Sequence, residues 1–290
     1  MNDDKFFLVA LGATEGLGNK SIARLVKFFG SAKAAWFADV DDLHKAGVRK
    51  NALAALVNYR AYNPDVPEIF ADYCDRYKIG VCSIFDDDYP PLLKAIDSPP
   101  TFFYYRGQLQ PTASRLAVVG SRQHTSYGQE IAFDFAEKFA AAGLTVVSGA
   151  ARGIDTFAHR GALKSGRTVA ILGCGLGCKI TREQAALLDQ IAENGVVISE
   201  FNLHVTPTPG TLVVRNRVIA GLSRAIVVVE AGEKSGALIA AKNTADYGRA
   251  VFAVPGQIYA DESRGCNNLI RNGATLVQSA QDVLVEVSHD

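Results

Sequence analysis

Two segments, Leu116-Ala-Val-Val-Gly-Ser-Arg122 and Leu144-Thr-Val-Val-Ser-Gly-Ala-Ala-Arg-Gly-Ile-Asp155, decide the fold. Each begins with an apolar, β-branched run that is typical of a parallel strand buried on both faces. Each run ends at Gly or Ser-Gly, where the chain turns readily. Between the two segments, apolar residues recur at helical spacing before a glycine that ends the run: Ile131, Phe135, Phe139 and Gly143. The stretch therefore predicts a strand, a crossover helix and a second strand.

The same alternation of strand and helix patterns continues to the end of the chain, which predicts an α/β fold with a doubly wound, mostly parallel sheet. Strands are expected at 116–119, 144–148, 168–172, 196–198, 225–229 and 250–254, and helices at 127–142, 154–165, 182–193, 215–221 and 236–247. A short helix, an apolar run and a last helix follow between 267 and 287. Because the loops that follow parallel strands emerge at one edge of the sheet, Arg122 and Arg152 are expected to point into one crevice.

The composition is sufficient for a sizeable core but does not indicate which ligand the protein binds. The chain has 290 residues, of which 48% are apolar, enough for one large domain and a small one. Thirty basic and thirty acidic residues give a net charge of zero. Any affinity for nucleic acid must therefore come from a local cluster of Arg and Lys.

The sequence also bears on location and on metals. It has no uncharged apolar run of about 18 residues, and Met1–Lys5 is polar, which predicts a cytoplasmic protein without a membrane anchor. The five cysteines are scattered and odd in number, which argues against disulfides. Cys174 and Cys178 lack a second Cys or His pair, so free thiols are favoured over a metal site; neither a metal nor a cofactor is expected.

Residues 1 to about 75 are predicted to be helical, as a domain separate from residues 76–290. Glycine turns at Gly16-Leu-Gly18 and Ala46-Gly-Val48 resemble those of a helix-hairpin-helix or SAM-like module, in which backbone N–H groups approach a phosphate. Lys20, Arg24 and Lys27 would lie beside such a site. The alternative is a small helical cap that only packs on the main domain.

Between the two parts, 62–110 is broken by prolines. Its apolar runs, Gly80–Phe85 and Phe102–Tyr105, predict two strands added to the edge of the main sheet. A short helix is expected around Leu92–Ile96, and Asp86-Asp87-Asp88 is expected to be a solvated turn.

Loops rich in small residues follow the predicted strands. Small residues let a ligand approach the main chain, helix N-termini favour anions, and two arginines make phosphate the expected anion. The candidate residues are Gly120, Ser121 and Arg122 after the first strand and Ser148, Gly149, Arg152 and Gly153 after the second. A third loop, 173–177, reads Gly-x-Gly-x-Gly, which is not the dinucleotide fingerprint, so NAD is not expected.

A further set of donors, Arg215, Asn216 and Arg217, is expected at the start of a short helix, where it would bind phosphate. The alternative is that these two arginines pair with Asp155 or Glu230 inside the domain.

Glu230 ends a predicted strand, and Ser235 and Gly236 begin the helix after it. Glu230 is interpreted as orienting an arginine of the pocket, with a catalytic acid or base as the alternative. Asp155 and His159 are one helical turn apart and are expected to hydrogen-bond as a structural contact.

Taken together, these motifs closely resemble the DprA/Smf DNA-processing family in order and spacing. The residues that carry the resemblance are Val119-Gly-Ser-Arg122, Tyr127-Gly128, Ser148-Gly149, Arg152-Gly-Ile-Asp155, Ala158-His159, Gly173-Cys-Gly175, Ser199-Glu200, Arg215-Asn-Arg217, Ala220-Gly-Leu-Ser223, Glu230-Ala231, Ser235-Gly236 and Val254-Pro-Gly256. The resemblance covers about 80–290, and the helical part looks like the SAM-like domain of that family.

The resemblance implies an extended Rossmann-like domain that binds single-stranded DNA, forms a homodimer and helps load the RecA recombinase in natural transformation, where it protects incoming DNA. It also implies that Arg122, Arg152, Arg215 and Arg217 contact phosphates. Such a groove fits the physics of single-strand binding, in which cations follow the backbone and stacking adds affinity for any sequence.

The chain departs from the family pattern in two places. Cys178-Lys-Ile-Thr-Arg182 stands where the family has Tyr-Pro-x-x-Asn, and Leu212-Val213 stands where it has Phe-Pro. Both departures concern the wall of the pocket. The winged-helix module of some relatives is not expected, because the sequence ends at Asp290.

The sequence therefore predicts a non-enzymatic, single-stranded DNA-binding protein. One alternative is an enzyme that binds or hydrolyses nucleotides or nucleotide-sugars with Glu230 as its catalyst. Another is a structural adaptor with a vestigial crevice.

Overall fold

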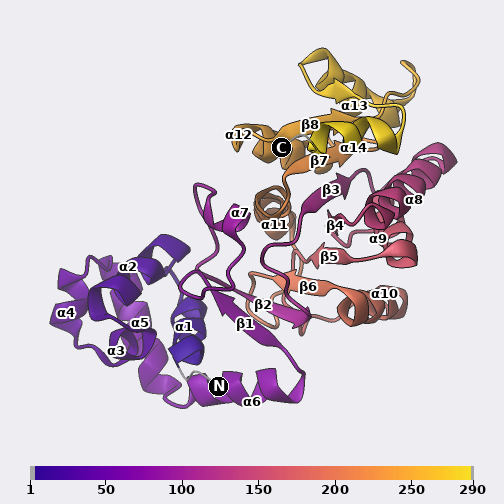
Figure 1. Cartoon of the computed structure of the whole chain (residues 1–290). Coiled ribbons are helices and arrows are strands. Elements are labelled where there is room, and N and C mark those ends of the chain that lie inside the picture. The colour runs from indigo at the N-terminus through magenta and orange to yellow at the C-terminus, as the bar shows by residue number, and fades with distance from the viewer. Residues whose placement is uncertain (1–3, 289–290) are drawn as a thin grey trace. The chain divides into compact units, whose positions relative to one another are not determined.

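The computed structural model describes residues 4–288, which divide into two compact units (Figure 1). Unit 1 comprises the described residues up to 89 together with 97–105. Unit 2 comprises 90–96 and the described residues from 106 onward. Residues 1–3, part of the polar amino terminus, and 289–290 lie outside the described range.

Unit 1 begins with helices throughout the segment that the sequence predicts to be helical. They are α1 (Asp4–Ala13), α2 (Asn19–Phe29), α3 (Ala32–Phe37), α4 (Val40–Lys45), α5 (Lys50–Tyr62) and α6 (Val66–Arg76). Strand β1 (Gly80–Ser83) follows and pairs antiparallel with β2 (Phe102–Gly107). The core of the unit is built from the largest apolar side chains of these helices, including Leu11, Leu25, Trp36, Leu43 and Leu56. The SAM-like relationship stays a prediction.

Unit 2 alternates strands and helices. After α7 (Pro91–Lys94) come β3 (Arg115–Val119), α8 (Ser126–Ala141), β4 (Thr145–Ser148), α9 (Ile154–Ser165), β5 (Thr168–Ile171), α10 (Arg182–Asn194) and β6 (Val196–Ser199). Then follow α11 (Pro209–Leu222), β7 (Ala225–Val228), α12 (Ala237–Asp246), β8 (Ala250–Ala253), α13 (Asp261–Arg271), β9 (Thr275–Leu276) and α14 (Ala280–Ser288). The predicted mixed α/β, mostly parallel fold is confirmed.

The strand order explains where a ligand can enter. Hydrogen bonding gives the order β1-β2-β6-β5-β4-β3-β7-β8-β9, and the pairs from β6 through β9 are parallel. The end of β2 continues into unit 2, where the N–H of Gln108 donates to the carbonyl of Gly195 (2.9 Å). The chain starts unit 2's parallel strands at β3, builds outward to β6, and returns to β7 on the other side of β3. The order therefore reverses between β3 and β7, and open α/β sheets bind ligands at such a point.

Helices cover both faces of the unit 2 sheet (Figure 1). On one face α8, α9, α10 and α14 bury apolar residues of the strands, with Leu116, Phe139 and Phe252 fully buried. On the other face α11 and α12 pack against each other and against the strands. The side chains of successive strand residues alternate between these faces, so Val118 faces α8 and Val119 faces α11.

One helix boundary differs from the sequence-based expectation. Helix α11 begins at Pro209, not at 215, because Thr208 and Thr211 form a capping box and Pro209 suits the first turn. The Arg-Asn-Arg motif therefore lies in the interior of a helix, and its expected place at a helix start is wrong. Contacts also group β1 and most of β2 with the helical unit. The domain division at residues 75 and 76 stays a prediction.

In the described part of the chain, every helix is too short or too polar to cross a membrane.

The guanidinium of Arg249 holds the end of α11. Its Nη1 donates to the carbonyls of Ala220 (2.6 Å), Gly221 (2.9 Å) and Ser223 (2.6 Å). Arg249→Ala leaves these carbonyls without that donor, so we expect the free energy of unfolding to fall by about 1–3 kcal/mol in urea denaturation. Arg249→Lys should restore only part of the loss, because an ammonium lacks the fork of donors.

The matched control is Arg264→Ala, which removes an exposed arginine whose ion pair with Asp261 lies within one helix. Its expected cost is below about 0.5 kcal/mol. An equal loss in the two alanine variants would contradict the role given to Arg249.

Candidate functional site

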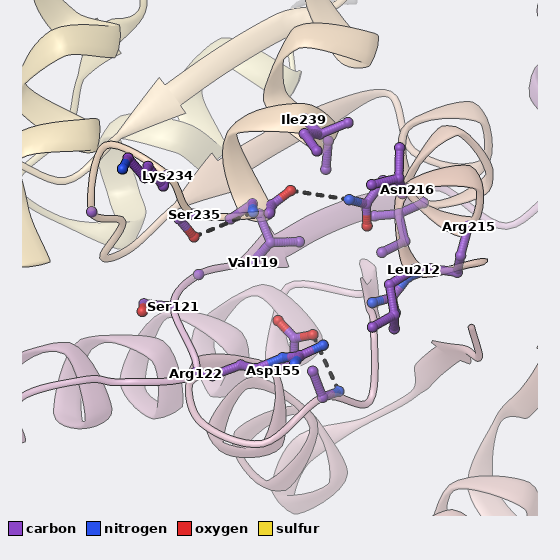
Figure 2. A pocket seen from close by; sticks show the side chains of 18 of the residues that line it. Val119, Ser121, Arg122, Asp155, Leu212, Arg215, Asn216, Lys234, Ser235 and Ile239 are labelled. Atoms are coloured by element: carbon purple, nitrogen blue, oxygen red, sulfur yellow. Dashed lines mark hydrogen bonds between the residues drawn. The ribbon is translucent and has the colours of Figure 1, made fainter. Parts of the chain in front are cut away.

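A crevice of about 710 Å³ opens where the strand order reverses, between the carboxyl ends of β3 and β7 (Figure 2). Four parts of unit 2 line it: the loop after β3, the loop after β4 with the start of α9, one side of α11, and the loop after β7 with the start of α12. Among the lining residues are Ser121, Arg122, Gln123, Asp155, Leu212, Arg215, Asn216, Lys234, Ser235 and Gly236. Most of the residues predicted to bind phosphate are thus brought together.

The loop after β3 is held by backbone contacts that require glycine. The N–H of Ser121 donates to the carbonyl of Glu230 (2.7 Å), and the carbonyl of Ser121 accepts from the N–H of Ile154 (3.2 Å). A Cβ at Gly153, whose φ is +88°, would lie 2.4 Å from the Ser121 carbonyl oxygen. A Cβ at Gly120 would lie 2.6 Å from Ile154. These close approaches fix the path of the chain that presents Arg122.

Three cations near the crevice have no ion-pair or hydrogen-bond partner among the residues described. Arg122 and Lys234 are exposed and line the crevice from opposite sides of the reversal point (Figure 2). Arg152 is also exposed; it lies outside the lining, although its neighbour Ala151 belongs to it. The sequence predicts that Arg122 and Arg152 point into one crevice. Arg122 lines the crevice and Arg152 does not.

Arg215 lines the crevice from α11 and is buried (Figure 2). Its Nη1 donates to the carbonyl of Gly149 and to that of Ile171 (2.6 Å). A Cβ at Gly149 would meet both the Arg215 guanidinium and the Asp155 carboxylate, so this position requires glycine. Burial lowers the pKa of Arg215 and the charge of Asp155 raises it. The alternative interpretation, a pairing of Arg215 with Asp155 or Glu230, is met only in part: the charge of Asp155 acts on Arg215, but the hydrogen bonds of the guanidinium go to backbone carbonyls.

Asp155 lies at the start of α9, on the floor of the crevice. Its carboxylate accepts from the N–H of Ala151 (3.3 Å) and from the backbone of Gly120, and the side chain of Ser148 lies beside it. Burial raises its pKa, and Arg215 together with these hydrogen bonds opposes the rise. Ser148 is buried and donates to the carbonyl of Val118 (2.7 Å), so it joins β4 to β3 and does not line the crevice.

Asn216 and Arg217 have different partners from Arg215. The Nδ2 of Asn216 donates to the carbonyl of Gly236 (3.0 Å), which ties α11 to the start of α12. The hydroxyl of Ser235 accepts from the N–H of Ala237 (3.3 Å). Arg217 lies outside the lining and forms an ion pair with Glu200, not with Asp155 or Glu230. Burial raises the pKa of Glu200 to about 7, although Arg217 favours the charged form.

Glu230 orients a helix and not an arginine, so that part of the expectation is wrong. Its two carboxylate oxygens accept from the backbone N–H (2.9 Å) and the hydroxyl (2.6 Å) of Thr125, the N-cap residue of α8. Gly128 lets the carboxylate approach, since a Cβ there would lie 2.2 Å from Glu230 Oε2. Glu230 does not belong to the lining of the crevice.

His159 is fully buried, and its Nδ1 hydrogen-bonds the hydroxyl of Thr168 (2.7 Å). Asp155 uses other partners, so the expected hydrogen bond between Asp155 and His159 is not formed. Burial, with a smaller contribution from the charge of Arg215, lowers the pKa of His159 to about 3. The imidazole is therefore neutral at physiological pH.

The third glycine-rich loop lies outside the crevice lining. Gly175 packs against the backbone of Asn202 and Leu203. Cys174 and Cys178 are free thiols that hydrogen-bond to each other, and burial raises the pKa of Cys174 to about 12.

One group of possible metal ligands occurs in the described chain, in unit 1: Cys82, Asp86 and Asp88. Lys5 already forms an ion pair with Asp86 there (2.6 Å).

Sequence reasoning missed Lys234, Gln123, Ile219 and Ile239 as lining residues. The two isoleucines form an aliphatic wall with Leu212 and Val213, which the sequence did place at the wall of the pocket. Lys234 directly precedes the predicted Ser235-Gly236 pair, so its position at a strand's carboxyl side was a usable signal. The wall depends on β7 lying beside β3, which are far apart in the sequence.

Comparison with known proteins identifies relatives of the chain. A family model described as DNA recombination-mediator protein A matches residues 80–288. Protein Smf of Synechocystis sp. is 34% identical over 293 residues, which cover 99% of this chain and 73% of that protein.

Two solved structures are also similar. The X-ray structure of DNA processing protein A from Streptococcus pneumoniae has a TM-score of 0.85 at 33% identity and covers 97% of each chain. DNA processing protein A from Helicobacter pylori, whose structure describes a single-stranded DNA binding mode, has a TM-score of 0.66 at 26% identity. It covers 73% of this chain and 97% of that one.

The close approach at Gly153 predicts that a larger residue there lowers the free energy of unfolding. Gly153→Ala places a methyl group against the Ser121 carbonyl in a left-handed backbone conformation, so we expect a loss of more than about 2 kcal/mol in urea unfolding. The control is Gly143→Ala, which has a similar φ of +86° but open space around the added Cβ. The control should lose about 1 kcal/mol, and equal losses would show that the Gly153 contact adds nothing.

Burial of neutral His159 predicts a pH dependence. The unfolded chain binds a proton at His159 near pH 6.5 and the folded chain only near pH 3, so this residue makes the fold less stable as pH falls below about 6.5. The expected contribution is about 1.4 kcal/mol per pH unit. In His159→Asn, whose amide can still reach Thr168, the dependence of stability on pH should be shallower by that amount. Comparable dependences in the two proteins would refute the assignment.

Proposed function

This chain belongs to the DNA recombination-mediator protein A family, and on that premise we propose that it binds single-stranded DNA across the crevice between β3 and β7. The observation that carries the proposal is the pair of exposed, unpaired cations, Arg122 and Lys234, on a crevice floored by buried Arg215. Unpaired cations are available to phosphates without first breaking an ion pair.

The predicted phosphate contacts take different parts in this proposal. Arg122 and Lys234 bind phosphates directly, and Arg152 meets the strand where it leaves the crevice. Arg215 contributes its charge from beneath while it holds the carbonyls of Gly149 and Ile171. Phosphate binding by Arg217 would have to compete with Glu200.

Bases and sugars would lie against the aliphatic wall, in which Leu212 replaces the family's phenylalanine. Because the crevice lining contains no aromatic side chain, stacking contributes less here and phosphate contacts more.

The placement of the titratable groups supports a binding function and not catalysis. Both oxygens of Glu230 accept hydrogen bonds from Thr125, and Glu230 lies outside the lining. His159 is buried and neutral, and it faces Thr168. Asp155 accepts a hydrogen bond from Ala151 in the loop before it and lies beside the positive charge of Arg215. We therefore propose a non-enzymatic role.

Membership of the family supports a proposal for the finer role. We propose that the protein protects incoming single-stranded DNA in the cytoplasm and hands it to the RecA recombinase, as a homodimer. Support for self-association comes from β9, an edge strand of two residues whose Leu276 is exposed beside the sheet. Leu276→Asp should shift the mass measured by light scattering toward a monomer, and an unchanged mass would place any dimer contact elsewhere.

Single-strand binding is tested with a labelled oligo-dT of about 30 nucleotides over a series of salt concentrations, followed by fluorescence anisotropy. The wild type should bind tightly and with strong salt dependence. Arg122→Ala with Arg152→Ala should weaken binding at least tenfold and lower the slope of log K against log salt by about 1.4, because two phosphate contacts are lost. Lys234→Ala should lower it by about half as much.

The control is Lys138→Ala with Lys164→Ala, which removes two exposed lysines in the last turns of α8 and α9, at the opposite edge of the sheet. Its affinity should stay within about twofold of wild type. A folded wild type that fails to bind oligo-dT would overturn the proposal.

A further inference from the structure

Unit 1 contains an internal repeat. Gly16, Leu17, Ala23, Leu25 and Val26 recur at a constant offset as Gly47, Val48, Ala54, Leu56 and Val57. Both glycines have φ of +80°, and Leu17 and Val48 are both buried. In each copy a helix leads into the glycine turn and a second helix leaves it, namely α1 and α2 in the first copy and α4 and α5 in the second. The helical part of the unit therefore contains two copies of a pair of helices joined by a glycine turn, with α3 between the copies.

The two turns pack against each other's copy. A Cβ at Gly16 would lie 3.4 Å from the Cβ of Ala52 in α5. A Cβ at Gly47 would lie 3.1 Å from Nη1 of Arg24 in α2. Each turn thus touches the helix that leaves the other turn, which is the exchange of contacts expected from an approximate two-fold relation. Both turns consequently lie on one face of the unit.

That face carries unpaired positive charge. Lys20 and Arg24 follow the first turn, and Arg49 and Lys50 follow the second; all four side chains are exposed. Within the described range, none of the four has a hydrogen-bond or ion-pair partner. The position of Arg24 against Gly47 brings the charge of the first copy to the second. Glu15 precedes the first turn, and Asp41 and Asp42 lie in α4 before the second, where Asp42 pairs with Lys45 (2.7 Å). The four cations outnumber these acidic residues.

We propose that this face binds double-stranded DNA through its phosphates. The two strands of a duplex are related by a two-fold axis and present equivalent phosphates, so two copies of one cationic turn, related in the same way, can each meet one strand. A single strand offers no symmetric second backbone. Lys and Arg contacts to phosphate carry no sequence information, so the binding is independent of sequence. Gly18, with no atom within 4 Å of an added Cβ, leaves space for the backbone of the duplex beside the first turn.

The chain then holds two separate nucleic-acid sites, the crevice of unit 2 for a single strand and this face of unit 1 for a duplex. The duplex site does not depend on the proposed function of the crevice.

The test uses the full chain and a labelled, blunt duplex of about 30 base pairs of arbitrary sequence, with anisotropy measured over a salt series. Lys20→Glu with Lys50→Glu should weaken duplex binding at least tenfold and lower the slope of log K against log salt by about 1.8. Arg76→Glu with Lys78→Glu makes the same change in net charge on exposed residues at the end of α6 and should stay within about threefold of wild type. Oligo-dT binding should be retained by the Lys20 and Lys50 variant.

A second variant, Gly18→Glu, puts a carboxylate on the face at a backbone conformation that any residue adopts (φ −86°, ψ 167°) and should also weaken duplex binding. Arg122→Ala with Arg152→Ala should keep it. Undetectable duplex binding by wild type at about 50 mM salt, wild-type affinity in the Lys20 and Lys50 variant, or an equal loss in the α6 control would each overturn the proposal. Because oligo-dT is measured in parallel, failure at this face is distinguishable from failure of the crevice.

Discussion

Arg215 carries a positive charge into the interior of unit 2, where its guanidinium donates to the carbonyls of Gly149 and Ile171 and lies beside Asp155. A buried charge is costly unless it is paired and hydrogen-bonded, so these partners must keep their positions. Gly149 has no Cβ because the guanidinium and the carboxylate occupy that space. The ends of β4 and β5 and the start of α9 are thereby locked to one side of α11.

This constraint shapes the crevice from below. Asp155, beside Arg215, accepts from Ala151 and from the backbone of Gly120, so the loops after β3 and β4 are joined through one carboxylate. Glu230 plays an equivalent role on the other side of the reversal point. Its carboxylate accepts from Thr125, the N-cap residue of α8, and its backbone carbonyl accepts from the N–H of Ser121. The charged residues inside the domain thus fix the loops. Those outside it, Arg122 and Lys234, are left free to meet a ligand.

The two proposed binding sites present positive charge on different scaffolds. In unit 2, a reversal of strand order opens a crevice and places cations on opposite sides of it. In unit 1, a repeated glycine turn places cations on one face. With a net charge of zero, the chain has no global attraction for nucleic acid, so local clusters of this kind are the physical route to such binding. A strong dependence on salt is the shared consequence.

The sequence by itself determined the elements and most of the site. Runs such as Leu116–Val119 and the spacing of Phe135 and Phe139 report local backbone preference and burial, both of which depend on near neighbours in the chain. Short motifs of glycine, serine and arginine marked Arg122, Asn216 and Ser235 as candidate site residues, because such motifs are also local features of the chain.

Only the tertiary structure decided which arginines are free and which are buried. The resemblance makes Arg122 and Arg215 equivalent phosphate contacts, but the carbonyls of Gly149 and Ile171 hold Arg215. Glu200, which follows β6, pairs with Arg217. The tertiary structure likewise placed Lys234 opposite Arg122, because β3 and β7 are neighbours in the sheet although far apart in the chain. Burial and ion pairing depend on contacts between distant segments, and no local pattern in the sequence encodes them.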